Sequence, residues 1–142
     1  MRKFAISDIH GCNRSFNTLL KKIKFTKEDQ LYLLGDYIDR GPDSRGVIDT
    51  ILDLIQKGFQ IQCLRGNHEA QILKARESRD DLYSWKSRWG GRQTLQSFGT
   101  HDFDKIASKY WKFFEELKFF FQVDNYILVH AGLNFEVEDP LE

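Results

Sequence analysis

The sequence has little of several residue types, and each scarcity excludes a class of protein. Two cysteines, Cys12 and Cys63, are too few for a disulfide-stapled secreted domain. With two prolines and no low-complexity tract, no interdomain linker is apparent. No apolar run approaches the roughly 20 residues of a membrane span, and the stretch between Lys3 and Asp8 is too short for a secretory signal core.

The chain also has no excess of charge of either sign. Lysine and arginine number 21, as do aspartate and glutamate, so the formal net charge is zero at pH 7. Such a balance lacks the basic footprint of a protein that binds nucleic acid or an anionic membrane. We therefore expect a cytoplasmic protein with no nucleic-acid partner and no membrane partner.

What is present is an alternation of strand and helix signals, which predicts an α/β fold in a single domain covering residues 1–142. Short apolar runs bounded by turn residues occupy 3–6, 30–34 and 60–64, and each is typical of a buried parallel strand. A hairpin is predicted over 119–129, where apolar residues flank the turn-forming pair at 124–125.

Apolar residues at helical spacing separate the strand signals. They predict helices over residues 15–24, 44–57, 68–73, 94–98 and 109–117. Ser44 is the expected cap of the second helix, and Gly58 its stop. The charged segment 75–90 carries Trp85 and Trp89 and is expected to lie over the site, where either tryptophan packs on the core or lines a substrate groove.

Three polar motifs directly follow the three strand runs. They read Ser7-Asp8-Ile9-His10-Gly11, Gly35-Asp36-Tyr37-Ile38-Asp39-Arg40-Gly41 and Gly66-Asn67-His68-Glu69. Open α/β sheets bind ligands at the carboxyl ends of their strands, so these motifs are expected to meet at one edge of the sheet.

The residue types in these motifs suit a two-metal site. Asp8 and His10 alternate around Ile9, so both side chains can point the same way from an extended segment. Asp36 has two carboxylate oxygens with which to bridge two cations. Nitrogen and oxygen donors without thiolate suit Mn, Fe or Zn, and two such ions can clamp the attacking and leaving oxygens of a displacement at phosphorus.

The motif order D-x-H-G, G-D-Y-x-D-R-G, G-N-H-E and H-A-G-L resembles the calcineurin-like metallophosphoesterases, specifically their phosphoprotein phosphatase branch. The resemblance runs from Asp8 to Leu133, and residues 89–99 resemble the tryptophan–double-glycine stretch of bacterial and phage members. It implies a layered αββα sandwich. It also implies hydrolysis of phosphate monoesters, in particular phosphoserine and phosphothreonine of a protein, by a water that two divalent ions activate, Mn first and Fe or Zn as alternatives.

The resemblance assigns each metal a set of ligands. One ion would be held by Asp8, His10 and Asp36. The other would be held by Asp36, Asn67 and His130.

The resemblance also assigns the catalytic roles. His68 would be the general acid for the leaving alkoxide, oriented by Asp39, and Arg40 would grip phosphate oxygens. The competing interpretation of Arg40 is a salt bridge to Asp43 or Asp49.

Members of this branch carry a further Gly-His motif and a further phosphate-binding arginine after H-A-G-L, which this chain does not contain before Glu142. We therefore expect the N-terminal portion of a phosphatase, with a weakened second metal site and exposed apolar surface between Phe119 and Val129. A diadenosine polyphosphate hydrolase, or a hydrolase of another small phosphoester, is an open alternative, although such enzymes are expected to depart from Asp-Arg-Gly and Asn-His-Glu. A non-catalytic metal-binding form is another.

Four nearby residues have structural interpretations. Glu69 is expected to cap the helix that follows it, Arg65 to be structural, Cys12 to pack, and His101 to lie at the surface.

Overall fold

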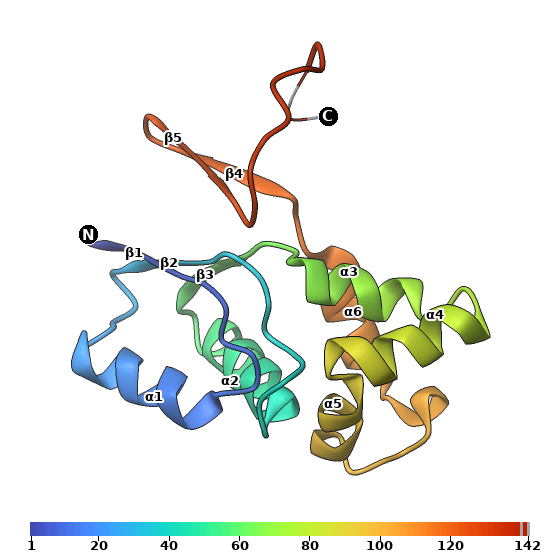
Figure 1. Ribbon diagram of the computed structural model, residues 1–142. Helices are drawn as coiled ribbons and strands as arrows, with labels where there is room; N and C mark the ends of the chain where they lie inside the picture. Colours follow the sequence, from blue (N-terminus) through green and yellow to red (C-terminus); the bar gives the residue numbers. More distant parts are fainter. Residues whose placement is uncertain (140, 142) are drawn as a thin grey trace.

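A parallel sheet forms the centre of the computed structural model, which describes residues 1–139 and 141. Its strands lie in the order β1 (Lys3–Ile6), β2 (Gln30–Leu33) and β3 (Gln60–Cys63). The connecting helices α1 (Asn13–Lys22) and α2 (Ser44–Gln56) both cover the same face of the sheet (Figure 1). Two crossovers of one hand produce this arrangement, and the predicted α/β class is confirmed.

The three strands are not equally buried. Leu31 and Leu33 of the central strand have no exposed surface, as predicted for buried parallel strands. The prediction is wrong for β1 and β3, where exposed and half-buried residues alternate. These outer strands have one face under the helices, while residues such as Gln60 and Gln62 on the other face reach solvent.

The N-cap of helix α2 lies one residue before the predicted cap. Asp43 is the N-cap, and its carboxylate accepts a hydrogen bond from the Gly46 amide at 2.9 Å. The hydroxyl of Ser44 is instead engaged with the backbone N–H of Asp39. The cap prediction was wrong because Asp43 caps locally, whereas Ser44 is held by a tertiary contact.

A helical layer lies beside the sheet, at the ends of the strands (Figure 1). Its elements are short, and one of them is a π-helix. They are α3 (Asn67–Lys74), α4 (Arg79–Ser84), the π-helix η1 (Trp85–Trp89), α5 (Gly91–Ser97), the 3-10 helix η2 (Phe103–Lys105) and α6 (Ser108–Glu116).

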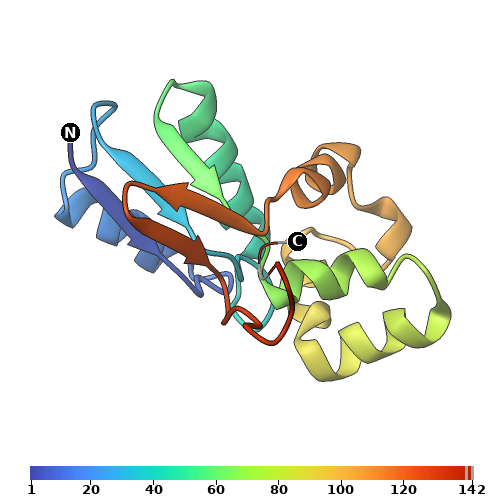
Figure 2. The same ribbon diagram turned by 90° about the horizontal axis from the view of Figure 1, so that it is seen from above.

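The predicted hairpin is present as β4 (Phe120–Val123) and β5 (Tyr126–Val129), which pair antiparallel. It lies over the sheet face opposite α1 and α2 (Figures 1 and 2). The Phe121 ring lies 6.0 Å from the ring of Tyr32, centroid to centroid. Helices, parallel sheet and hairpin thus give three of the four layers expected of the αββα sandwich.

Part of the apolar surface of the hairpin segment is exposed, as expected between Phe119 and Val129. Phe119, Tyr126 and Ile127 have exposed fractions of 69%, 71% and 46%. Phe113 and Phe114 of α6 are buried instead, so the aromatic residues of this part of the chain divide between core and surface. Among the described residues, no helix combines the length and apolar character of a membrane span.

Candidate metal centre and active site

The loops after β1 and β2 continue side by side beyond the strands. The amides of Asp8, His10 and Gly11 donate in turn to the carbonyls of Gly35, Asp36 and Tyr37, at 3.2, 2.9 and 2.8 Å. This ladder fixes the two motifs relative to each other before any ligand binds.

The side chains of Asp8 and His10 do not leave an extended segment, contrary to our expectation. Their φ angles are +57° and +44°, and Asp36 has a φ of +59°. Left-handed backbone is uncommon outside glycine but is tolerated by Asp, Asn and His. The curled loop therefore replaces simple strand alternation as the device that brings these donors together.

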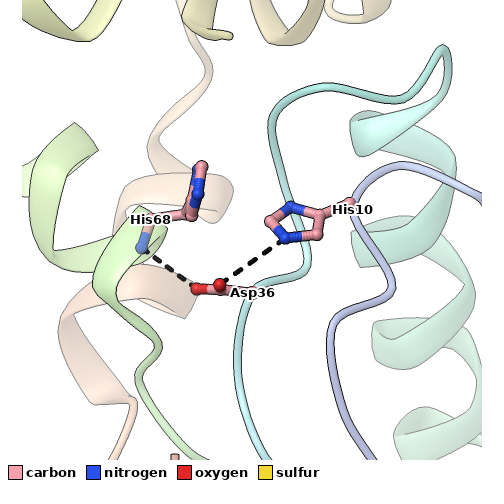
Figure 3. Close-up of side chains that lie close together, drawn as sticks. All are labelled: His10, Asp36 and His68. Carbon is pink, nitrogen blue, oxygen red and sulfur yellow. Dashed lines mark hydrogen bonds and ion pairs between the residues drawn. The ribbon is translucent and has the colours of Figure 1, made fainter. Parts of the chain in front are cut away.

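Asp36 lies at the centre of the site and is almost fully buried. Its Oδ2 is 3.6 Å from Nε2 of His10 and 3.4 Å from Nε2 of His130. Its Oδ1 accepts a hydrogen bond from the backbone amide of His68 at 3.0 Å (Figure 3). The carboxylate is therefore anchored by α3 while its other oxygen faces two imidazoles.

Both of these histidines present Nε2 to the centre. Nδ1 of His10 donates to the Ile38 carbonyl at 2.8 Å, and Nδ1 of His130 donates to the Leu34 carbonyl at 2.7 Å. Nε2 of His130 also lies 2.8 Å from Oδ1 of Asn67. A backbone carbonyl on the second nitrogen is typical of metal-bound histidine.

Four of the five predicted ligands lie in two groups of three that share Asp36; His68 is the remaining member of one group, and Asn67 contacts the other group through His130. Donor atoms of His10, Asp36 and His68 lie within 4.8 Å of one another, and so do those of Asp8, Asp36 and His130. This grouping pairs Asp8 with His130, whereas the resemblance pairs it with His10; Oδ1 of Asp8 and Nε2 of His10 are 3.9 Å apart. The donor set fits hard-to-borderline divalent ions, and Asp36 is the donor that both groups use.

Glu69 caps α3, as expected, and also ties two loops together. Its carboxylate accepts from the amides of Gly66 at 3.0 Å, and of Asp36 and Tyr37 at 2.8 Å each. The side chain is fully buried, and burial raises the pKa of Glu69 to about 7 despite these donors. Glu69 therefore caps α3 and also holds the loop that carries Asp36.

His68 and Asp39 form a buried pair beside the centre, with no exposed surface on either residue. Nδ1 of His68 lies 2.8 Å from Oδ2 of Asp39, and Nε2 has no hydrogen-bond partner among the described residues. The His68 ring meets the His10 ring edge to face at 4.6 Å and the Trp89 ring at 5.1 Å. One imidazole nitrogen is therefore held by a carboxylate and the other is free for chemistry.

Arg40 follows Asp39, is exposed and has a φ of +67°. In the described part of the chain its predicted competitors are engaged elsewhere. Asp43 accepts from Asn13 and Gly46, and Asp49 from Arg45, Lys109 and Tyr110. Neither pairs with Arg40, so the salt-bridge interpretation is not supported.

The expectation for Arg65 is confirmed, and the expectation for Cys12 is wrong. Arg65 is structural, as expected: its Nη2 donates to the carbonyls of Phe114 and Glu115 at 3.2 and 3.0 Å. Cys12 is exposed, so its expected packing role was wrong. It lies at the N-cap position of α1.

Sequence reasoning missed the residues that surround Asp39. Oδ2 of Asp39 also accepts from Nε1 of Trp85 at 3.0 Å, and Oδ1 accepts from Oγ1 of Thr94 at 2.6 Å. The only sequence signal was the Trp89-Gly90-Gly91 stretch that lies between them in the chain.

Comparison with known proteins identifies a family for this chain. The family model described as calcineurin-like phosphoesterase matches residues 1–141. The chain belongs to this family. Divalent metal ions are implied by membership of the family, and the shared donor Asp36 and its neighbours fit them.

Two curated relatives of this phosphoesterase are named symmetrical bis(5'-nucleosyl)-tetraphosphatases. The one from Nitrosomonas europaea is 34% identical over 97% of this chain and 48% of its own length. The one from Nitrosospira multiformis is 34% identical over 94% of this chain and 44% of its own length. The chain therefore spans about half the length of the curated relatives it matches.

A solved structure shares the fold. The protein serine/threonine phosphatase from Saccharomyces cerevisiae superimposes with a TM-score of 0.67 over 94% of this chain and 42% of that one, at 20% identity. At this identity the likeness supports the metallophosphoesterase fold alone.

Proposed function

We propose that this chain carries the metal-binding part of a phosphoesterase that hydrolyses dinucleoside polyphosphates, cutting a bis(5'-nucleosyl) tetraphosphate at the middle of its phosphate chain. The observation that carries the proposal is the convergence of histidine and carboxylate donors on Asp36, beside the buried pair of His68 and Asp39. The names of the two bacterial relatives support this substrate over the phosphoprotein that the motifs first indicated.

The proposed metals are two divalent ions, Mn first, with Fe or Zn as alternatives. The residues that would hold them are Asp8, His10, Asp36, Asn67 and His130. When bound, such ions stabilise charge on phosphoryl oxygens and lower the pKa of water towards neutrality.

The protein's own residues supply orientation and a proton. Nε2 of His68 is proposed to donate a proton to the leaving phosphate oxygen, while Asp39 holds Nδ1 and so fixes the ring. Arg40 has no carboxylate partner in the described residues, and its planar guanidinium can bind two oxygens of one phosphate at once. A polyphosphate offers such oxygens on every unit.

Substrate competition on the 142-residue chain with Mn tests the proposal. We expect bis(5'-adenosyl) tetraphosphate to be converted to adenosine diphosphate, measured by anion-exchange chromatography, at least tenfold faster than phosphate is released from a phosphoseryl peptide. Faster release from the peptide would restore the protein phosphatase interpretation.

A metal measurement on the same samples separates lost metal from wrong substrate. Asp36→Asn is expected to lower Mn content at both sites, measured by elemental analysis, and Asp8→Asn at one. Asp124→Asn in the hairpin turn is the matched control and should keep the parent Mn content. Mn binding without turnover of either substrate would favour the non-catalytic form.

A further inference from the structure

The carboxylate of Asp39 accepts hydrogen bonds from three different elements. Besides His68 of α3 at 2.8 Å, Trp85 of η1 donates at 3.0 Å and Thr94 of α5 at 2.6 Å. All four residues have no exposed surface. Because bulk solvent does not reach these bonds, the three donors determine how the carboxylate sits.

Counting donors and acceptors identifies the donor in the bond between His68 and Asp39. Indole Nε1–H can only donate, and a carboxylate oxygen accepts. The oxygen that meets the indole also contacts Nδ1 of His68, so Nδ1 is the donor of that bond. Nε2 of His68, buried and without a partner among the described residues, is left as the nitrogen that faces the metal centre. Trp85 thus helps to hold Asp39 as the acceptor for Nδ1–H of His68.

Thr94 orients Asp39 from the other side. Its hydroxyl proton goes to Oδ1, and its oxygen accepts from the backbone N–H of Asp39 at 2.9 Å. Ser44 accepts from the same N–H at 3.1 Å and contacts Thr94 at 3.2 Å. Asp39 has a φ of +68°, a strained value for a residue with a side chain, so these bonds hold both its backbone and its carboxylate.

The double glycine brings the tryptophan into place. A Cβ on Gly91 would lie 2.4 Å from the indole ring of Trp85, and one on Gly90 would lie 2.6 Å from the backbone nitrogen of Arg40. Gly90 has a φ of +93°, which ends η1 and starts α5. Only glycine permits this contact, and a π-helix inside a helical run frequently marks a functional site.

We infer that Trp85 and Thr94 are positioning residues for the reaction: they hold Asp39 so that it keeps the bond to Nδ1–H of His68 and fixes the direction of Nε2. The inference rests on the proposed function for its kinetic consequence. The hydrogen-bond arrangement itself belongs to the metal-free chain and can be measured there.

Paired substitutions separate the hydrogen bonds from packing. Trp85→Phe removes the indole N–H and keeps an aromatic ring. Thr94→Val removes the hydroxyl at nearly constant volume, and Thr94→Ser restores it. The matched controls are Trp111→Phe, which loses an N–H bond to the Ile106 carbonyl, and Thr50→Val, which loses a hydroxyl bond to Asn13.

The first readout is the Nδ1–H proton resonance of His68 in the metal-free chain, assigned by its loss in His68→Asn. We expect it to be present in the parent, in Thr94→Ser and in both controls. It should vanish or shift in Trp85→Phe and Thr94→Val. An unchanged resonance in both of these variants, with native circular dichroism, overturns the inference whatever the enzyme does.

The second readout is the split between kcat and KM on bis(5'-adenosyl) tetraphosphate. Trp85→Phe and Thr94→Val should lower kcat about tenfold, a part of the contribution of a general acid, and leave KM within twofold. Thr94→Ser should recover most of kcat. Loss of the resonance with unchanged kcat would refute the kinetic part.

The two readouts keep failure of the inference distinct from failure of the proposed function. A parent chain that shows the resonance and turns over no dinucleoside polyphosphate contradicts the function alone. If Trp85→Phe does not fold, the Thr94→Val and Thr94→Ser pair decides the inference.

Discussion

The parallel sheet and the hairpin are built from similarly apolar strands, yet they are packed to different extents. In β2, Leu31 and Leu33 have no exposed surface, whereas in β5 Tyr126 and Ile127 are 71% and 46% exposed. The sheet lies between two helices and the hairpin, but in the described residues the outer side of the hairpin has no covering layer. Burial of these strands is therefore set by what lies on each face.

The two regions also contribute unequally to the site. The loops around the parallel sheet provide Asp8, His10, Asp36 and Asn67, and they are joined by backbone hydrogen bonds. The hairpin provides only His130, which reaches the centre through its bond to the Leu34 carbonyl. The comparison predicts that the first region sets stability and that the second completes a site already formed.

The largest expected effect comes from one matched pair of strand substitutions. Leu33→Ala in β2 should lower the free energy of unfolding by about 2–5 kcal/mol, because it opens a cavity in the core. Ile127→Ala in β5 should lower it by less than about 1 kcal/mol, as expected away from the core. Urea denaturation measures both, and equal losses would show that the hairpin is packed as tightly as the sheet.

The second prediction concerns the point where the two regions meet. Gly35 has a φ of +104°, and a Cβ there would lie 2.5 Å from the Gly66 nitrogen and 2.9 Å from Nδ1 of His130. Gly35→Ala should therefore cost about 3 kcal/mol, from backbone strain together with overpacking.

Gly58→Ala is the matched control for that loss. Gly58 has a φ of +84°, and no heavy atom lies within 4 Å of the point that a Cβ would occupy. Only about 1 kcal/mol of backbone strain is therefore expected. The urea concentration at the unfolding midpoint and the affinity for Mn, measured by titration, should both be lower in Gly35→Ala than in the parent. Unchanged Mn affinity in Gly35→Ala would show that the contact between the two regions at Gly35 does not shape the metal site.

The smallest expected effect is a pH dependence that differs between two ion pairs. Arg2 binds Asp29 through two hydrogen bonds, at 2.9 and 2.7 Å, and holds the pKa of that carboxyl well below its usual range. A lowered carboxyl pKa stabilises the fold above the unfolded value of about 3.9, and this stability is lost as the pH falls through the folded value. The thermal unfolding midpoint of Asp29→Asn should therefore be lower than that of the parent at pH 7. The difference between the two midpoints should narrow below about pH 4.

Asp124→Asn provides the comparison from the hairpin. Asp124 pairs with Lys3 between exposed side chains, and such surface pairs contribute little. Thermal unfolding midpoints at pH 7, 5 and 3 should show no gap between Asp124→Asn and the parent. A gap as large as that of Asp29→Asn would mean that the hairpin pair is as important as the buried one.

Much of the site was predictable because its residues follow strands directly. Asp8, Asp36 and Asn67 each lie just past a strand end, and parallel strands bring such ends to one edge. The role of Glu69 as a cap was predictable for the same local reason. The curled backbone at Asp8 and His10 was not, because left-handed φ values at aspartate and histidine depend on the neighbouring loop that holds them.

The sequence by itself determined the order of strands and helices, the three polar motifs and the hairpin turn, because each depends on residues close together in the chain. Only the tertiary structure decided which faces of the outer strands stay exposed and which donors share Asp36. It also decided that Trp85 and Thr94, 46 and 55 residues beyond Asp39, meet its carboxylate. Such contacts depend on how the helical layer packs against the sheet, and local periodicity carries no information about that packing.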